Sequence, residues 1–390
     1  MVKKKLLSLA VLLGFASILW AGNLKIKVYN PGSKAIFPIT STIIYGDKDA
    51  ILVDAQFQKQ YAEQLVKEIK ATGKNLKTVF ISHSDPDFYF GLDVIKKAFP
   101  NVKIISTAQT AYLISASKDD KIAVWKPQLK ADAPSEIIIP EAVTSIPDLE
   151  GNVIEIKQNA EDPAHSFLWI PSLKTITGGI SVSVGSHLWM ADTQNIKAID
   201  RWIGQIDAMK ALHPEQVVPS HFEKQSLSPQ SLDFVKNYLE NYKKAVTENK
   251  TVSAITDFMV KKYPDLQGKD SLEMGVKVFL GEMNWDLKSP YPAIGRKVEA
   301  DFGTVKFLLD FKDNRVMTFH GLTDGLKGNT ETVDYTTVEV AKNVFMVYWH
   351  ESAGFNITHV EDYNKNVVYT NIAGKDGTFT HLKGTLKILQ

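Results

Sequence analysis

The chain has 390 residues, of which 44% are hydrophobic and 23% charged, and it contains no cysteine. The composition is typical of a globular protein and the length indicates about two domains, while the missing cysteine excludes disulfides, thiolate nucleophiles, cysteine-ligated zinc and iron–sulfur clusters. The formal net charge of +1 gives no electrostatic argument for nucleic-acid binding, so we expect no nucleic-acid partner.

The N-terminal segment is typical of a secretory signal peptide. Three lysines at 3–5 precede an uncharged apolar run of 16 residues, Leu6 to Ala21. This run is shorter than the roughly 20 apolar residues that a membrane-spanning helix needs, although a retained anchor stays possible. We predict that residues 1–21 are a signal peptide, that no stable membrane anchor remains after cleavage, and that the protein is periplasmic or secreted.

The following segments alternate between strand and helix patterns. Strands are predicted over 23–29, 36–45, 50–53, 78–82 and 103–106, with short strands over 133–170. Helices are predicted over 58–72, 92–99, 108–121 and 194–212. Alternating strands and helices with early hairpins indicate an α/β sandwich.

The last third of the chain divides into a helical part and a β part. Ser228 and Pro229 form a good helix start, and 229–263 is predicted to be largely helical, with a further helix over 273–287. After Pro292 short strand patterns recur between turn residues, which indicates an all-β barrel.

Polar side chains follow several predicted strands. His83, Asp85 and Asp87 come directly after one of them, and alternate residues of extended backbone point to the same side. His165 and His221 follow later strands in the same way. Imidazole nitrogen and carboxylate oxygen are suitable ligands for zinc, iron or manganese. One such residue alone is usually an ordinary loop residue, but together the five predict a metal site.

These residues give the chain a resemblance to the metallo-β-lactamase superfamily, over about Leu24–Tyr263. The segment Ser82–Gly91 resembles the family motif His-x-His-x-Asp-His with a following Gly, and Asp54 matches the Asp that ends an early strand. The stretches Gly185–Asp192 and Val217–His221 are also similar. The resemblance implies an αββα sandwich over residues 22–228, followed by a helical tail or linker over 229–290.

The ligand set departs from the family motif at several positions. His83 and Asp87 match its first His and its Asp, whereas Asp85 stands where the second His is expected and Phe88 replaces the last His.

Two later ligands are present and one is missing. His165 and His221 match the family's later histidines. The bridging Asp is expected near Gly179 or Ile180, and no acidic residue occurs between Asp162 and Asp192.

The resemblance therefore implies one divalent metal ion, most simply zinc, with iron or manganese as alternatives. Its ligands would be His83, Asp85 and His165, while Asp87 and His221, the remaining family ligands, are too few to hold a second ion tightly. Asp87 and His221 are then the candidate catalytic residues, with Asp87 orienting a water as general base.

Two functions are consistent with this reduced site. The first is hydrolysis of an ester, lactone or amide bond in a small-molecule substrate through metal-activated water. The second is a degenerate site, in a protein that binds a ligand without turnover or serves as a scaffold. His187 is a candidate substrate contact at the pocket mouth, although packing against the next helix is the preferred interpretation.

The C-terminal segment has a resemblance of its own. Phe345–Glu351, Ile357–Tyr363 and Val367–Ile372 are similar to MoaF-like domains, which are calycin-type small β-barrels. The resemblance implies such a barrel over residues 291–390, and it implies a fold without implying a reaction. Glu351 and His359 can line a pocket or form a cross-strand pair outside it, but an ordinary barrel interior and surface is the expectation.

Overall fold

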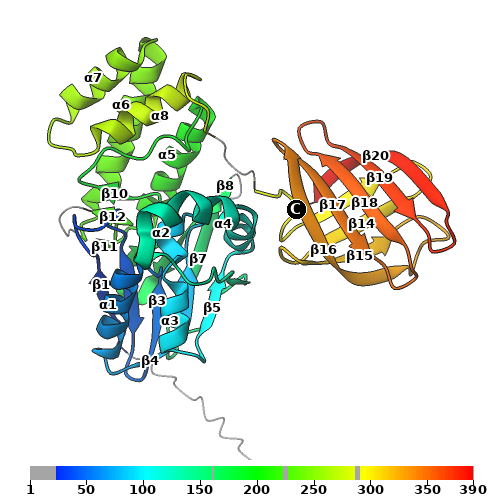
Figure 1. The fold of residues 1–390 in the computed structure, drawn as a ribbon, viewed down its shortest axis with the longest axis horizontal. Helices are drawn as coiled ribbons and strands as arrows, with labels where there is room; N and C mark the ends of the chain where they lie inside the picture. Colours follow the sequence, from blue (N-terminus) through cyan, green and yellow to red (C-terminus); the bar gives the residue numbers. More distant parts are fainter. Residues whose placement is uncertain (1–22, 160–161, 223–226, 286–289, 390) are drawn as a thin grey trace, which may run out of the picture.

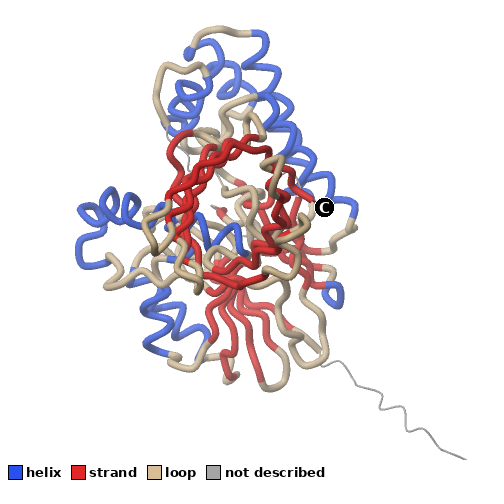
Figure 2. Tube along the Cα trace, turned by 90° about the vertical axis from the view of Figure 1, so that its right-hand side faces the viewer, coloured by secondary structure: helices blue, strands red, loops and turns tan. Residues whose placement is uncertain are grey.

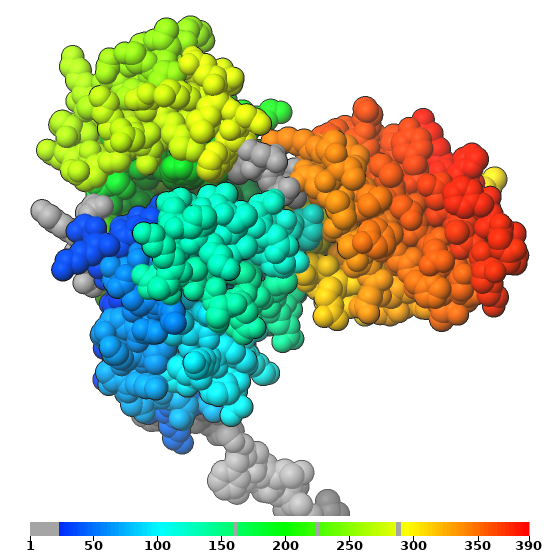
Figure 3. All heavy atoms as spheres, in the orientation of Figure 1, coloured from blue at the N-terminus to red at the C-terminus, as the bar shows by residue number. Residues whose placement is uncertain are grey.

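The computed structural model describes residues 23–159, 162–222, 227–285 and 290–389. The predicted signal peptide at 1–21 lies outside these residues. Among the described helices, none has the length and apolar character needed to cross a membrane. An α/β domain, with a group of helices at one end, stands beside a C-terminal barrel that forms a separate lobe (Figure 1, Figure 3).

The first sheet has six strands in the order of the chain. They are β1 (Lys25–Tyr29), β2 (Ser41–Tyr45), β3 (Asp49–Val53), β4 (Asn75–Ile81), β5 (Lys103–Ser106) and β6 (Glu141–Ala142). The β1–β2–β3 part is antiparallel, and β3 to β6 are parallel. Parallel strands place their carboxyl ends at one edge, where ligands usually bind.

The second sheet has the order β11–β9–β8–β7 and lies face to face with the first. Its strands are β7 (Glu155–Asn159), β8 (Asp162–Ile170), β9 (Thr175–Thr177) and β11 (Gln216–Val217), and β10 (Ser183–Val184) pairs separately with β12 (His221–Phe222). Val53 and Phe80 of the first sheet share a core with Leu168 and Ile170 of the second. This apolar layer between two sheets is what a sandwich needs to exclude water.

Helices cover both outer faces of the sandwich. On the first sheet pack α1 (Lys59–Lys70), α3 (Leu92–Ala98) and α4 (Ala108–Leu129), and the one-turn α2 (Pro86–Tyr89) lies just before α3. The second sheet shares a core with α5 (Ile196–Ala211), α6 (Gln230–Glu248), α7 (Val252–Lys262) and α8 (Lys269–Phe279). Burial of Leu65 and Ile69 four residues apart shows how α1 meets the sheet with one face. The predicted αββα architecture is confirmed.

The helical tail differs from the prediction in one respect. The segment 229–263 is two helices, because α6 ends at Glu248 and Thr251 caps the start of α7 by accepting a hydrogen bond from the Ala254 amide. A threonine side chain that caps a new helix favours a break at this point.

The C-terminal domain is a closed antiparallel barrel of eight consecutive strands, as predicted. These are β13 (Lys297–Asp301), β14 (Lys306–Phe311), β15 (Val316–Gly321), β16 (Thr330–Ala341), β17 (Val344–His350), β18 (Asn356–Asp362), β19 (Val367–Ala373) and β20 (Phe379–Leu389). Pairing of β13 with β20 closes the ring that Figure 2 shows. Closure leaves no strand edge exposed.

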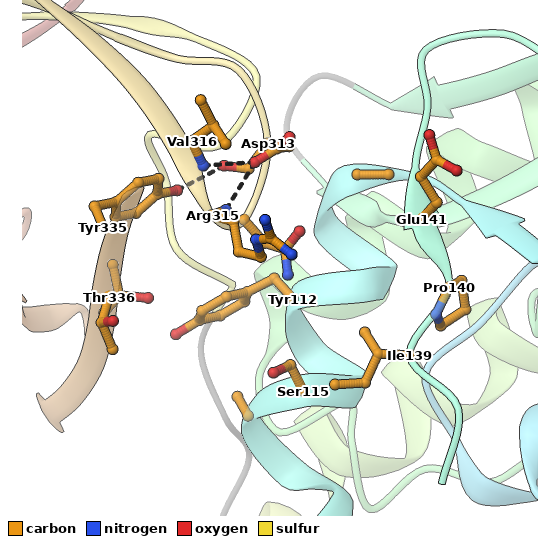
Figure 4. A pocket seen from close by; sticks show the side chains of 14 residues that line it. Tyr112, Ser115, Ile139, Pro140, Glu141, Asp313, Arg315, Val316, Tyr335 and Thr336 are labelled. Carbon is orange, nitrogen blue, oxygen red and sulfur yellow. Dashed lines mark hydrogen bonds between the residues drawn. The ribbon is translucent and has the colours of Figure 1, made fainter. Parts of the chain in front are cut away.

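The barrel meets the α/β domain through α4. Tyr112 of α4 is buried and lies 6.4 Å from the ring of Tyr291, and the Gln109 amide donates a hydrogen bond to the Ile294 carbonyl. Beside this contact lies a cleft of about 640 Å³ between the domains, with Tyr112 on one wall and Arg315 and Tyr335 on the other (Figure 4).

Candidate metal centre

The five residues predicted from the sequence come together in two groups. The first group is His83, Asp85 and His165, in which the imidazole centroids of His83 and His165 are 5.3 Å apart. The second is Asp87 and His221, in which Asp87 Oδ2 lies 2.8 Å from His221 Nε2. His83 and Asp85 follow β4, Asp87 lies on α2, His165 on β8 and His221 on β12, so segments from both sheets meet here.

Phe88 lies between the two groups. Its ring centroid is 5.2 Å from that of His83 and 5.9 Å from that of His221, with edge-to-face geometry at both. An apolar ring thus lies between the two groups, at the position where the family motif has its last histidine.

Asp85 has charged neighbours on two sides. Its Oδ2 lies 3.4 Å from His83 Nε2, and its Oδ1 lies 3.2 Å from Lys121 Nζ, which also donates to the Ser84 carbonyl. Burial alone would raise the pKa of Asp85, but the charges of Lys121 and His83 hold it well below its usual range. Asp85 is therefore a carboxylate, able to bind a cation through Oδ2.

Asp162 orients His165. Its Oδ1 lies 2.8 Å from His165 Nδ1, and a carboxylate so placed accepts the Nδ1 proton and leaves Nε2 with a lone pair. Burial opposes protonation of His165, but the hydrogen bond and charge of Asp162 outweigh it and raise the pKa of the imidazole. The His165 side chain is 37% exposed, which makes it the accessible side of the first group.

Asp87 and His221 form a closed network. While His221 Nε2 contacts Asp87, its Nδ1 lies 3.1 Å from Ser220 Oγ, which itself donates to the Val182 carbonyl. Asp87 and Ser220 thus contact the two ring nitrogens of His221. His221 therefore has no ring nitrogen without a protein partner.

The missing bridging Asp is explained by the backbone at Gly179. Its φ of +77° is a conformation that favours glycine, and a Cβ there would stand 2.2 Å from the Ser166 carbonyl oxygen. Its amide donates to Ser82 Oγ, which donates to the buried Asp54. The fold therefore excludes an Asp at position 179.

Three charged residues of the site were not predicted from the sequence. Lys121 lies on α4, and its position in the helical pattern does not distinguish it from other surface lysines. No motif assigns a role to Asp162 or Asp192. Asp192 accepts hydrogen bonds from the indoles of Trp189 and Trp285, and burial raises its pKa, with the nearby charge of Asp85 adding to the effect. Asp192 thus lies near the first group because of tertiary packing, which its position in the sequence does not indicate.

His187, the candidate substrate contact, lies against a helix. It is buried, with Nδ1 2.9 Å from the hydroxyl of Tyr238 on α6 and its ring against that tyrosine. Burial lowers its pKa. This contact supports the preferred interpretation of packing against a helix, and the role of His187 as a substrate contact stays a prediction.

The spacing within the first group can be compared with the spacing of zinc ligands. Two ligand atoms of one tetrahedral zinc lie about 3.3 Å apart and two ligating imidazole centroids about 5 Å apart; the His83–Asp85 and His83–His165 separations of 3.4 and 5.3 Å match these values. Within the described residues no three His, Asp or Glu side chains already stand as a complete ligand set. Buried His83 Nδ1 has no hydrogen-bond partner among the described residues, while its Nε2 faces Asp85.

Comparisons with known proteins agree with this architecture. A sequence model of the metallo-β-lactamase superfamily matches residues 36–221, and a model of MoaF-like domains matches residues 294–387. The curated protein YobT of Bacillus subtilis (strain 168), described as uncharacterized, is 23% identical over 105 residues, which are 26% of this chain and 44% of YobT. The match thus spans less than half of that relative.

Several solved structures are similar to the chain at low identity. A β-lactamase domain protein from Burkholderia ambifaria is 12% identical with a TM-score of 0.48, covering 68% of this chain and 89% of that one. A metallo-β-lactamase family protein from Thermus thermophilus is 11% identical with a TM-score of 0.47, covering 70% and 95%. A metallo-β-lactamase from Pontibacter korlensis is 18% identical with a TM-score of 0.40, covering 56% and 100%.

Proposed function

We propose, since residues 36–221 match a model of the metallo-β-lactamase superfamily and residues 294–387 match a model of MoaF-like domains, that the α/β domain is a hydrolase with a single divalent metal ion. The observation that carries the proposal is the first group: Asp162 orients His165 with Nε2 free, beside His83 and the ionised Asp85. These three residues would hold the ion, which we take to be zinc, with iron or manganese as alternatives. When bound, such an ion supplies Lewis acidity and a water that ionises near neutral pH.

The residues of the chain itself have separate tasks. Lys121 holds Oδ1 of Asp85, so only Oδ2 of that carboxylate is turned toward His83. Asp87 shares a proton with His221 at 2.8 Å and is the proposed general base, with His221 as the group that returns the proton. The target would be an ester, lactone or amide bond of a small molecule.

The reaction compartment is also part of the proposal. The basic and apolar N-terminal segment supports export of the protein to the periplasm or medium with removal of residues 1–21. The balanced charge supports small molecules, and no nucleic acid, as partners.

Metal content of the purified chain tests this function. After dialysis we expect about one equivalent of zinc, iron or manganese per chain, because the first group has room for one tight ion. His83→Ala should release it, while the matched control His381→Ala, at an exposed histidine of the barrel, should retain it. A metal-free chain whose melting temperature does not respond to added zinc would refute the proposal.

A second function is favoured by one specific observation. Lys121 already pairs with Asp85, and His221 already contacts Asp87, so both carboxylates have a protein partner without a metal. This pairing supports a metal-free site that binds a ligand without turnover. Binding of a screened lactone or ester by the metal-free chain, without hydrolysis, would support this second function.

A further inference from the structure

The cleft between the two domains is of a size that suits a small ligand. Its volume of about 640 Å³ lies within the range of about 300–1,000 Å³ that is typical of such sites, which often lie between domains. The α/β domain lines the cleft with α4 and the segment Ile139–Ala142, and the barrel lines it with the β14–β15 turn and β16 (Figure 4). None of the lining residues is a candidate metal ligand, so the cleft is separate from the metal centre.

One wall of the cleft is the free edge of the first sheet. The last strand of that sheet, β6, pairs only with β5 among the described strands. Ala142 lies opposite Ser106, and the Val143 amide donates to the Ser106 carbonyl. Successive residues of a parallel ladder bond to opposite sides, so the N–H and C=O of Ala142 point away from β5. Because no described residue hydrogen-bonds to them, the edge offers the cleft one donor and one acceptor.

Charged side chains of opposite sign line the cleft on its two sides. Glu141 of β6 is exposed and forms no ion pair within the described part of the chain. On the barrel side, Arg315 is 76% exposed and its nearest carboxylate, on Asp334, lies at the outer limit of an ion pair, 3.9 Å away. The Oδ1 of Asp313 accepts from the amides of Arg315 and Val316 and so fixes the turn that carries the guanidinium. A complementary ligand thus has a positive group for Glu141 and a negative group for Arg315.

Apolar side chains complete the walls beside the sheet edge. Ile139 is 39% exposed, which is high for a large apolar residue, and it lines the cleft together with Val316 and the ring of Tyr112 (Figure 4). Contact with an apolar group of a ligand would remove this surface from water and favour binding. The cleft therefore combines a strand edge, an apolar wall and two opposite charges.

We propose that this cleft binds a short peptide with free termini, which adds to β6 as an extended strand. The peptide backbone pairs with the N–H and C=O of Ala142, and one of its apolar side chains contacts Ile139. Its ammonium terminus pairs with Glu141 and its carboxylate terminus with Arg315. Both charges are present only in a peptide that begins and ends within the cleft, so the two charged residues select for short peptides.

Calorimetric titration of the full chain with matched peptides tests the ligand class. The probes are alanine peptides of about three to five residues with one internal phenylalanine, since an extended strand advances about 3.3 Å per residue. The tightest of them is compared with its N-acetylated form and its C-amidated form. We expect each cap to weaken binding about three- to fivefold, the size of an exposed ion pair. Equal binding of free and capped forms, or no binding of any peptide, would overturn the proposed class.

Two variants at exposed positions locate the site, and neither removes a buried contact. In Arg315→Gln the C-terminal amide should no longer weaken binding, and in Glu141→Gln the N-terminal acetyl group should no longer do so. The matched controls Lys327→Gln and Glu63→Gln change exposed residues that do not line the cleft, and both should keep the two cap effects. A cap effect that persists in its matching variant would show that the peptide binds elsewhere, the metal centre included.

N-methylation along the peptide tests the strand pairing with the unaltered protein. Successive amides of a strand point to opposite sides, so only alternate N–H groups face β6. We expect methylation to weaken binding at least about tenfold at one amide and to have little effect at the next. The same effect at every amide, or no effect at any of them, would refute addition of the peptide to β6.

Discussion

Asp162 decides which nitrogen of His165 is available in the metal centre. A carboxylate behind a ligating histidine fixes its tautomer, and loss of such a partner typically costs about 10–100-fold in metal affinity. We predict this loss for Asp162→Ala, measured by zinc competition with a chelator. Asp200→Ala is the matched control, because Asp200 is an exposed residue of α5 that pairs with Lys243. Equal zinc affinity in the two variants would contradict the role given to Asp162.

Asp54 makes stability depend on pH. Burial outweighs its hydrogen bonds from Ser82 and raises the pKa of Asp54 from 3.8 to about 8. Between these values the folded state keeps a proton that the unfolded state has released. The stabilising contribution of the group is thus complete below about pH 4 and is lost as the pH rises through 8, at no more than about 1.4 kcal/mol per pH unit.

The test of Asp54 is urea unfolding of Asp54→Asn at pH 5 and pH 8. Asparagine keeps an acceptor for the Ser82 amide and does not ionise, so the free energy of unfolding should fall less between the two pH values than in the unaltered chain. Asp334→Asn, at a carboxylate that is 80% exposed, should leave the difference unchanged. A steeper fall in Asp54→Asn would show that the sign is wrong.

The turn after β9 shows why a lost ligand cannot simply be restored. Gly179 has positive φ and its missing Cβ makes room for the Ser166 carbonyl, so Gly179→Ala should lower the free energy of unfolding by about 2 kcal/mol or more. Gly204 is the matched control, since it is an exposed residue of α5, where an added Cβ would have no atom within 4 Å. Gly204→Ala should raise the free energy of unfolding by about 0.5–1 kcal/mol. Thermal and urea unfolding of both variants measure these opposite shifts.

The helices and strands themselves were largely predictable from local pattern. The helix predicted over 194–212 is α5 at Ile196–Ala211, because its apolar residues recur at helical spacing and Asn195 caps it. The helix predicted over 108–121 continues to Leu129, and the one over 273–287 is α8 at Lys269–Phe279. Boundaries differ more than positions because the end of a helix depends on capping and on tertiary contacts.

Docking of the barrel on α4 joins the two domains of the molecule. Tyr112 is 5% exposed and lies against barrel residues, so Tyr112→Asp would place a charge in this interface. We expect small-angle scattering to show a larger radius of gyration for this variant. Val124→Asp on the same helix is the control, since Val124 is 60% exposed and should tolerate a charge. Unchanged scattering from Tyr112→Asp would show that other contacts hold the domains.

The sequence by itself determined the order of elements, both fold classes and the five candidate residues of the metal centre, because periodicity and short motifs are local properties. Only the tertiary structure decided how those residues pair. Lys121 reaches Asp85 from α4, Asp162 fixes His165, and Glu361 lies buried beside His359. These contacts form because the residues lie close together in the folded chain. A buried charge pairs with a group that is near it in space, and the spacing of residues along the sequence does not predict which group that is.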